Sequence, residues 1–234
     1  DAAELKVAGY DLAQLLGAGF DAAQLTSAGF EEADVQEQQQ QQSLLQKLSE
    51  KVRKPVDELC SSTSLDLVGE SLDDADCPAL AVLLTVNAVL TTLDLAINKV
   101  GYVGAEALAG ALRVNAVLTK LVLYENNIAD AGASALAESL KVNAVLTKLD
   151  LRFNQISDAG ASALGSALSV NAVLKELYLF ENSIGDVGAE ALASALRVNA
   201  VLTLLDLTYN NIKENGKKQL REAVQGREGF NLYL

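Results

Sequence analysis

The sequence predicts an α/β fold of stacked strand–helix units, preceded by a small all-α segment. Three observations support this prediction. The pentapeptide VNAVL occurs five times without change, and the copies follow one another with a constant 28-residue period. Within every 28-residue unit, the hydrophobic pattern changes from a period of two to a period near that of a helix. Residues 1–35 follow a different, decapeptide repeat, which predicts a separate segment.

Residues 1–35 predict three short helices. They read DAAELKVAGY, DLAQLLGAGF and DAAQLTSAGF, so each decapeptide begins with an Asp suited to cap a helix. Near the end of each stands a Gly, which we expect to close the helix in a left-handed conformation: Gly9, Gly19 and Gly29. We expect the helices to pack through one leucine each and through the aromatics that follow the glycines: Leu5, Leu15, Leu25, Tyr10, Phe20 and Phe30.

The next two stretches connect this segment to the repeats. Residues 36–42 are rich in Gln, and we expect a flexible or helical spacer there. Residues 43–62 predict N-terminal capping helices, because Val52 and Val56 fall one repeat period before Leu80 and Leu84. The outward side of this cap is basic: Lys47, Lys51, Arg53 and Lys54. A polar outer face is what a terminal unit of a stack requires.

Residues 63–230 contain six units. The VNAVL copies are Val86–Leu90, Val114–Leu118, Val142–Leu146, Val170–Leu174 and Val198–Leu202. In the first half of a unit, leucines such as Leu93 and Leu95 alternate with variable residues, which predicts a short strand. In the second half, apolar residues share one helix face: Ala105, Leu108, Ala109 and Leu112. Residues 231–234, NLYL, predict a half-strand that closes the stack.

Local roles follow from these positions. Acidic residues stand at the helix starts of the middle units, and we expect each to cap its own helix: Asp130, Asp158 and Asp186. We interpret VNAVL as a scaffold part. Its valines and leucine are expected to point into the stack, and its Ala to fill the small slot that Cys60 occupies in the cap. Its Asn is expected to end the helix in a left-handed conformation.

The pattern LxLxxNxI followed by GAxALAxAL, over about residues 63–230, resembles the leucine-rich repeats of the ribonuclease-inhibitor type. The same type forms the sensing end of many intracellular immune-receptor proteins. The resemblance implies a curved solenoid with a parallel sheet on its concave side and helices on its convex side. It also implies a ladder of inward-pointing Asn residues after the strands: Asn98, Asn126, Asn154, Asn182 and Asn210. The decapeptides resemble LxxAGF repeats that accompany leucine-rich repeats in some other proteins.

Composition and charge argue against several classes of partner. The net charge of −13 argues against nucleic acid or an anionic membrane surface as the main partner, because both require basic patches. No stretch is apolar for long enough to insert into a membrane. Residues 1–37 hold eight acids and one Lys, a net charge of −7. This part is therefore either an acidic interaction surface or a solvated face.

The sequence offers little for catalysis. It contains no His, the usual general base and the commonest metal ligand. Asp94, Asp150 and Asp206 share one strand column, but a full extra strand separates each from the next, roughly 10 Å. We therefore expect no enzyme, no metal site and no cofactor. The two cysteines, Cys60 and Cys77, predict reduced thiols and an intracellular, cytoplasmic protein, or one in an organelle after removal of a targeting peptide.

Variation between the units indicates where a partner binds. Four columns of outward strand positions run through the six units and together make up a small part of the chain. Five of the eleven Tyr and Phe residues lie there, where chance would place about one. Aromatics beside Arg and Glu are typical of binding hot spots, although aromatics also favour strands for packing reasons. The candidate partner-binding residues are Tyr124, Arg152, Phe153, Tyr178, Phe180, Tyr209, Asp94, Asp150, Asp206, Glu125 and Glu181.

We therefore expect a non-enzymatic module that binds a protein partner on its concave face, with residues 1–42 as a second candidate protein contact. The main alternative is a peripheral structural subunit, held in a large assembly through the N-terminal segment. A weaker alternative is a GTPase-activating regulator, since one group of such proteins uses this repeat type. Arg152 is the only Arg in the four columns, which gives that alternative little support.

Overall fold

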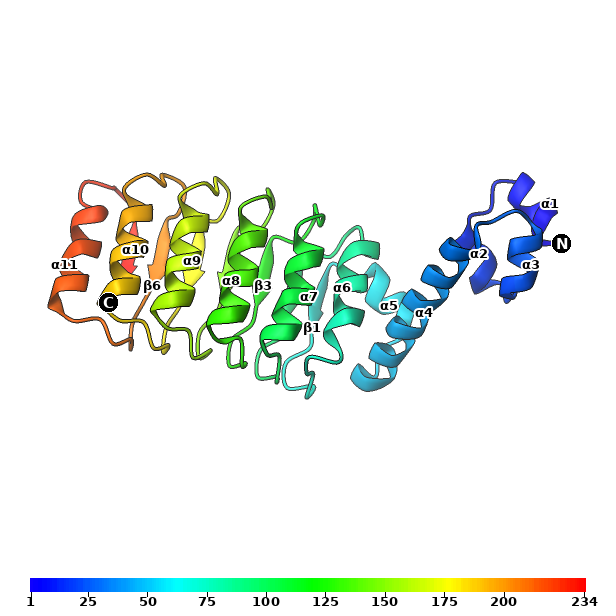
Figure 1. The fold of residues 1–234 in the computed structure, drawn as a ribbon, viewed down its shortest axis with the longest axis horizontal. Coiled ribbons are helices and arrows are strands. Elements are labelled where there is room, and N and C mark those ends of the chain that lie inside the picture. Colours follow the sequence, from blue (N-terminus) through cyan, green and yellow to red (C-terminus); the bar gives the residue numbers. More distant parts are fainter.

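The computed structural model describes all 234 residues and shows one row of stacked strand–helix units with a helical segment at one end (Figure 1). Seven parallel strands form a single sheet in chain order. They are β1 (Ser64–Asp66), β2 (Thr92–Asp94), β3 (Lys120–Val122), β4 (Lys148–Asp150), β5 (Glu176–Tyr178), β6 (Leu204–Asp206) and β7 (Asn231–Tyr233). This order confirms the predicted α/β solenoid.

Six helices alternate with the strands and line up along one face of the sheet (Figure 1). They are α6 (Cys77–Val86), α7 (Tyr102–Leu112), α8 (Ala129–Leu140), α9 (Asp158–Leu168), α10 (Asp186–Leu196) and α11 (Glu214–Ala223). We call the opposite face of the sheet the open face. No helix of the chain combines the length and the apolar character needed to cross a membrane.

Each strand pairs with the next through equivalent residues of neighbouring units. Leu93 lies opposite Leu65 on one side and opposite Leu121 on the other, and the 28-residue offset holds from β1 to β6. The final strand, β7, pairs with β6 by placing Leu232 opposite Leu205. This constant register brings corresponding side chains of successive units into columns.

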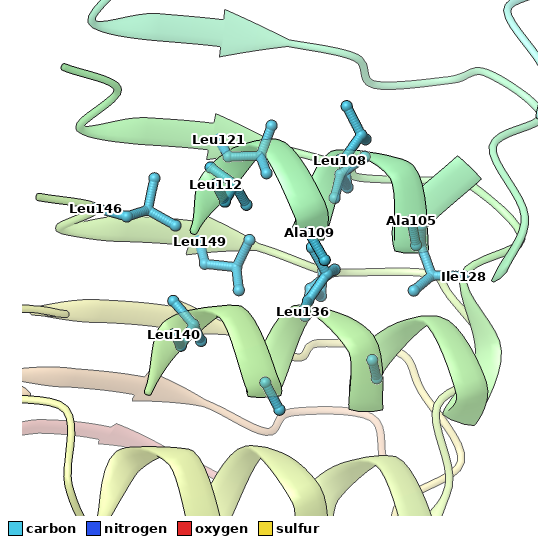
Figure 2. Close-up of a cluster of buried hydrophobic side chains, with 14 of the residues drawn as sticks. Ala105, Leu108, Ala109, Leu112, Leu121, Ile128, Leu136, Leu140, Leu146 and Leu149 are labelled. Atoms are coloured by element: carbon cyan, nitrogen blue, oxygen red, sulfur yellow. The ribbon is translucent and has the colours of Figure 1, made fainter. Parts of the chain in front are cut away.

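A continuous core of 51 buried residues runs the length of the stack. Figure 2 shows how it is built between α7 and α8: the helix leucines Leu112 and Leu140 lie beside the strand leucines Leu121 and Leu149. All four side chains are almost completely buried. Burying one Leu contributes roughly 1.5–3 kcal/mol, so this column dominates the stability of each unit.

The predicted Asn ladder at the strand ends is confirmed. Asn126 donates from Nδ2 to the Leu95 carbonyl of the preceding unit at 2.9 Å, and its Oδ1 accepts from the N–H of Val100 at 2.9 Å. The other members make corresponding bonds: Asn98, Asn154, Asn182 and Asn210. Each side chain therefore satisfies backbone groups that the buried turn would otherwise leave unpaired.

The Asn of VNAVL does not end the helix by the left-handed backbone that was predicted. No Asn of the chain is left-handed, and Asn87 has a φ of −81°. The side chain closes the turn instead. In the third copy, Asn143 Oδ1 accepts from the N–H groups of Val145 at 3.0 Å and Leu146 at 2.8 Å. Its Nδ2 donates to the Leu112 carbonyl of the preceding unit at 2.7 Å. The left-handed backbone is unnecessary because the side chain supplies the bonds, which form a second ladder.

Only the Asn and the Leu of VNAVL are buried in every copy. The first valine is 60–73% exposed in four of the five copies: Val114, Val142, Val170 and Val198. The Ala is also exposed, so it does not fill a core slot equivalent to the half-buried Cys60. Both predictions were wrong for one reason. The Asn side chain must point into the stack, and its immediate neighbours then point away.

The acidic residues at the helix starts cap the helix of the next unit and not their own. Asp158 Oδ1 accepts from the N–H groups of Gly185 at 2.7 Å and Gly188 at 2.8 Å, at the start of α10. Asp74, Asp130 and Asp186 make equivalent bonds. A Cβ atom on Gly188 would lie 2.8 Å from Asp158 Oδ1, so the absence of a side chain permits this approach. The caps therefore join successive units.

The N-terminal segment contains the three predicted short helices, α1 (Ala2–Val7), α2 (Leu12–Gly17) and α3 (Ala22–Ser27). The three glycines have φ values of 83–94°, as expected for left-handed residues that close a helix. Leu15, Leu25 and Val35 form the centre of a small separate core with Ala2. Tyr10 is 48% exposed and lies outside this core, contrary to the prediction.

One long helix connects this segment to the repeats (Figure 1). The two connecting helices are α4 (Glu32–Val52) and α5 (Val56–Ser61). Residues 36–42 lie inside α4, so the Gln-rich stretch is helical. Pro55 separates the two helices, since the residue before a Pro disfavours helix. Lys51 forms an ion pair with Asp76, at the start of α6, and this pair ties the cap to the first repeat.

Candidate protein-binding face

The predicted site residues occupy the strands β2–β6 and the turns that follow them. In each strand the central Leu is buried, while the flanking residues are mostly half-buried, which places the latter on the open face. The structure brings some of these residues into direct contact and leaves others apart. They separate into an aromatic row, two internally paired polar groups, two glutamates without an ion-pair partner, and two aspartates that bind backbone N–H groups.

Four aromatic rings form a continuous row across β3–β6. The ring centroids of Tyr124 and Phe153 are 5.2 Å apart, those of Phe153 and Phe180 are 5.4 Å apart, and those of Phe180 and Tyr209 are 5.1 Å apart. The Tyr124–Phe153 and Phe180–Tyr209 pairs meet edge to face at 88° and 70°, a geometry that aromatic pairs prefer, and the Phe153–Phe180 pair is tilted at 50°. We call these four residues the aromatic row. It ends at Tyr209, which is 73% exposed.

The row alternates between two columns of the repeat. Tyr124 and Phe180 stand one residue after the second strand leucine, and Phe153 and Tyr209 stand two residues after it. Successive rings are therefore 29, 27 and 29 residues apart, that is, one residue more, one fewer and one more than the 28-residue period. The columns considered separately do not show this contact, and only the combined spacing indicates it.

Tyr178 does not belong to the aromatic row. It belongs to a group of polar side chains on the open face that pair with one another. Its hydroxyl donates to Glu176 Oε2 at 2.9 Å and accepts from Lys148 Nζ at 3.2 Å. Lys148 also pairs with Glu176 at 2.8 Å and lies 4.5 Å from the centre of the Tyr178 ring. Although burial opposes it, hydrogen bonding to Glu176 and Tyr178 raises the pKa of Lys148. These three side chains hold one another in place.

Arg152 and Asp150 form a second internal pair. Arg152 Nε lies 2.8 Å from Asp150 Oδ1 and 3.0 Å from Oδ2, and the Asp150 side chain is only 3% exposed. The guanidinium lies between the rings of Tyr124 and Tyr178, at 5.1 and 5.6 Å from their centres. The hydrogen bonds to Asp150 raise the pKa of Arg152. Its charge is thus engaged within the protein, as that of a nearly buried Asp requires.

The other aspartates of the column have a local role. Asp94 Oδ1 accepts from the N–H of Ala96 at 3.0 Å, and Asp206 Oδ1 accepts from the N–H of Thr208 at 3.0 Å. Asp150 makes the same type of bond to the residue two positions later, at 3.2 Å. The column therefore caps strand ends, and it brings no two carboxylates together as an acid–base pair.

The column that lies two residues after the second strand leucine has an unusual backbone conformation. Every non-glycine residue in it has a left-handed φ of 51–57°: Ile97, Glu125, Phe153, Glu181 and Tyr209. In the first unit the same position is Gly69, with a φ of 70°. A side chain in this conformation costs roughly 1–2 kcal/mol per residue, and Gly avoids that cost. The turn thus accepts Gly, yet the later units carry large or charged side chains there.

Glu125 and Glu181 stand on either side of Phe153 in this column. Both are exposed, and neither takes part in an ion pair. The three residues line an open depression of about 580 Å³. Its other walls are polar: Asn98, Asn126, Asn127, Gln155, Asn182 and Ser183. The sequence columns include the two glutamates, but they do not reveal the depression.

Comparisons with known proteins identify the repeats. A protein-family model described as Leucine Rich repeat matches residues 86–109, 114–137, 142–165, 170–193 and 198–216. A solved structure titled "Leiomodin-1 Actin-Binding Site 2 (ABS2)" is similar to 78% of this chain over 86% of its own, with 17% identity and a TM-score of 0.45. No curated protein sequence matches the chain significantly. Proteins of this repeat family typically act in protein interactions, and the chain belongs to the leucine-rich-repeat family.

Proposed function

We propose that this chain is a non-enzymatic protein-interaction module that binds a protein partner on the open face, which corresponds to the predicted concave side. The observation that carries the proposal is the aromatic row, four rings in contact across four repeats. Aromatic clusters with polar surroundings resemble the hot spots of protein interfaces. The row gives the partner a rigid apolar centre, because each ring is held by its neighbours.

Backbone strain supports the same proposal. Phe153 and Tyr209 occupy left-handed positions where Gly69 shows that no side chain is needed for the turn. Packing does not account for Tyr209, since 73% of its surface is exposed. Strained residues are commonly retained at functional sites, where the side chain has a role that offsets the strain. A binding role is therefore better supported than a purely structural one.

The shape of the face favours a protein over a small molecule. Small-molecule sites are concave and bury most of the ligand. The depression beside Phe153 is open and largely polar, and the aromatic row extends beyond it over four strands. The net charge of −13 also argues against nucleic acid as the main partner. An intracellular location fits the two free cysteines.

Of the alternatives, the peripheral structural subunit keeps one supporting observation, the net charge of −7 in residues 1–37. Its test is deletion of residues 1–31, which leaves α4 intact, whereas a cut after residue 42 would divide that helix. Release of the chain from an assembly by this deletion, with binding to the open face retained, would favour it. The GTPase-activating alternative is weaker, because Arg152 is already bound to Asp150.

A pull-down with quantitative mass spectrometry tests the proposal. The test variants are Tyr209→Gly and the fourfold variant Tyr124→Ala, Phe153→Gly, Phe180→Ala, Tyr209→Gly. Tyr102→Ala is the matched control, because Tyr102 is an exposed aromatic at the start of α7. We expect a protein captured by the wild type and the control to be lost from both test variants. Equal capture by all four proteins, with circular dichroism showing them folded, would refute the proposal.

A further inference from the structure

The charges of the open face do not balance. The four columns hold three cations: Lys120, Lys148 and Arg152. They hold seven acids: Asp66, Asp94, Asp150, Asp206, Glu125, Glu176 and Glu181. Three positive and seven negative charges leave a net charge of −4. Two of the cations are already used in internal pairs with Glu176 and Asp150. A complementary partner must therefore bring positive charge to this face.

Among these acids, Glu125 and Glu181 are the exposed ones that make neither an ion pair nor a hydrogen bond to a backbone N–H group. Asp66, Asp94 and Asp206 accept hydrogen bonds from backbone N–H groups two residues ahead. The glutamates make no ion pair, are exposed, and line the depression that holds Phe153 between them. Their strands are separated by one intervening strand, so their backbones lie about 10 Å apart. The chain has no group of three or more Asp, Glu, Cys or His side chains that could hold a metal ion.

A flat cation with donors on more than one edge fits this arrangement best. The guanidinium of Arg stacks on aromatic faces and is weakly hydrated, so it loses little when it leaves water. It also donates hydrogen bonds of about 2.8 Å to carboxylates on separate sides. The ammonium of Lys is a compact and strongly hydrated charge, which satisfies one carboxylate and gains less from the ring.

We infer that the protein partner places an arginine side chain in this depression, with its guanidinium on the Phe153 ring and hydrogen bonds to Glu125 and Glu181. The inference rests on the proposed function, because the arginine belongs to a segment that also contacts the aromatic row. The row supplies the apolar centre of the interface and the two glutamates supply its charge selectivity. Binding weakens with increasing salt, as for any interface with exposed charge pairs.

A selection from a library of random dodecapeptides tests this inference on the full-length chain. The target variants are the wild type, Tyr209→Gly, and Glu125→Gln/Glu181→Gln. The matched control is Glu106→Gln/Glu190→Gln, which changes the charge equally at two exposed helix positions. We expect peptides that share an arginine, bind the wild type and the control alike, and bind Glu125→Gln/Glu181→Gln at least tenfold more weakly. Replacing the arginine by citrulline, its uncharged analogue, should cause a similar loss, and lysine an intermediate one.

The outcomes separate the inference from the proposed function. Peptides that depend on Tyr209 but lack arginine, or that ignore Glu125→Gln/Glu181→Gln, would overturn the inference and leave the aromatic row as a binding face. Peptides that bind without regard to Tyr209 or to the glutamates would overturn both. Both would also be overturned if no peptide from the library binds the open face. Thermal melts of Glu125→Gln/Glu181→Gln should match the wild type, since both side chains are exposed and lack ion pairs.

Discussion

Replacing Tyr209 by Gly should remove a binding side chain at little cost to stability. The ring contacts Phe180 at 5.1 Å, and losing such a contact lowers the free energy of unfolding by about 0.5–1.5 kcal/mol. The φ of 57° strains a non-glycine residue by roughly 1–2 kcal/mol, and Gly removes that strain. The added freedom of Gly in the unfolded chain costs about 0.5–1 kcal/mol. These terms nearly cancel, so the net change should lie within about 1.5 kcal/mol.

Comparison with Tyr209→Ala makes the prediction sharper. Ala loses the same ring contact but keeps the strained φ, so the Gly variant should be the more stable by about 0.5–1 kcal/mol. This order reverses the usual preference of ordered positions for Ala over Gly. Urea denaturation followed by circular dichroism measures the difference directly. With a slope near 3 kcal/mol/M, the midpoints should differ by about 0.2–0.3 M.

Two results would contradict this reasoning. If Tyr209→Ala is the more stable variant, the backbone at this position is not left-handed in solution, and strain no longer supports a binding role. If both variants capture the partner as the wild type does, the aromatic row does not extend its contact to β6. A loss of capture by both variants, with the Gly variant the more stable, is the result expected.

The remaining predictions concern stability and reactivity. Leu146→Ala removes a side chain that is 1% exposed and should cost about 2–5 kcal/mol in urea titrations. Gly188→Ala should cost about 1–3 kcal/mol, because its Cβ would stand 2.8 Å from a carboxylate oxygen. The control Gly110→Ala, with nothing within 4 Å, should be neutral or stabilising. Burial raises the pKa of Asp130, but hydrogen bonds from the start of the next helix outweigh it and lower the pKa overall. The stability from these bonds is therefore present above the unfolded pKa of about 4 and lost as the pH falls below it, and acid titration of Asp130→Asn should lack this loss. Burial raises the pKa of Cys77 to about 12, so thiol reagents at pH 8 should react with the other cysteine first.

The repeat fold could be predicted because its rules are local. Alternation around Leu93 and Leu95 sets a strand, the stripe that includes Leu108 and Leu112 sets a helix, and the 28-residue period repeats both. The bonds between units could not be predicted in the same way. Asp158 looks like a cap for its own helix, and its true partners, Gly185 and Gly188, lie in the following unit. That pairing depends on how adjacent units stack, which no short window of sequence contains.

The VNAVL motif shows a second limit of a single sequence. Exact repetition indicates a common constraint on all five residues, but it does not say which side chains are buried. Asn143 could end a helix by a left-handed backbone or by side-chain hydrogen bonds, and both are common for Asn. The structure uses the second, which turns Val142 toward solvent. Burial therefore accounts for the constancy of the Asn and the Leu, and not for that of the first Val.

The sequence predicts which types of residue the candidate site contains, but it does not predict which of them contact one another. The excess of Tyr and Phe in the outward columns indicates the open face as a candidate, because finding it requires only the period of the repeat. The columns do not predict the pairing of Arg152 with Asp150, although residues two apart in a strand share a face. From the sequence columns alone, Arg152, Asp150 and Tyr178 are expected to be open to a partner. The structure instead commits them to internal contacts and leaves Glu125, Glu181 and the aromatic row.

The positions that hold the stack together are separate from those that vary. The ladder bonds of Asn126 and Asn143 and the cap of Asp158 reach the neighbouring unit from turns where the same residue recurs. In the ladder at the strand ends, each Asn stabilises the turn that contains it, so the side chain just before this Asn is free to change. The Asn residues of this ladder are Asn98, Asn126, Asn154, Asn182 and Asn210. Phe153 and Gly69 occupy equivalent positions of the repeat with the same left-handed backbone, although Gly69 is followed by Glu70 and not by an Asn. Since Gly is the unstrained choice, the large side chains in later units support the proposed contact with a partner.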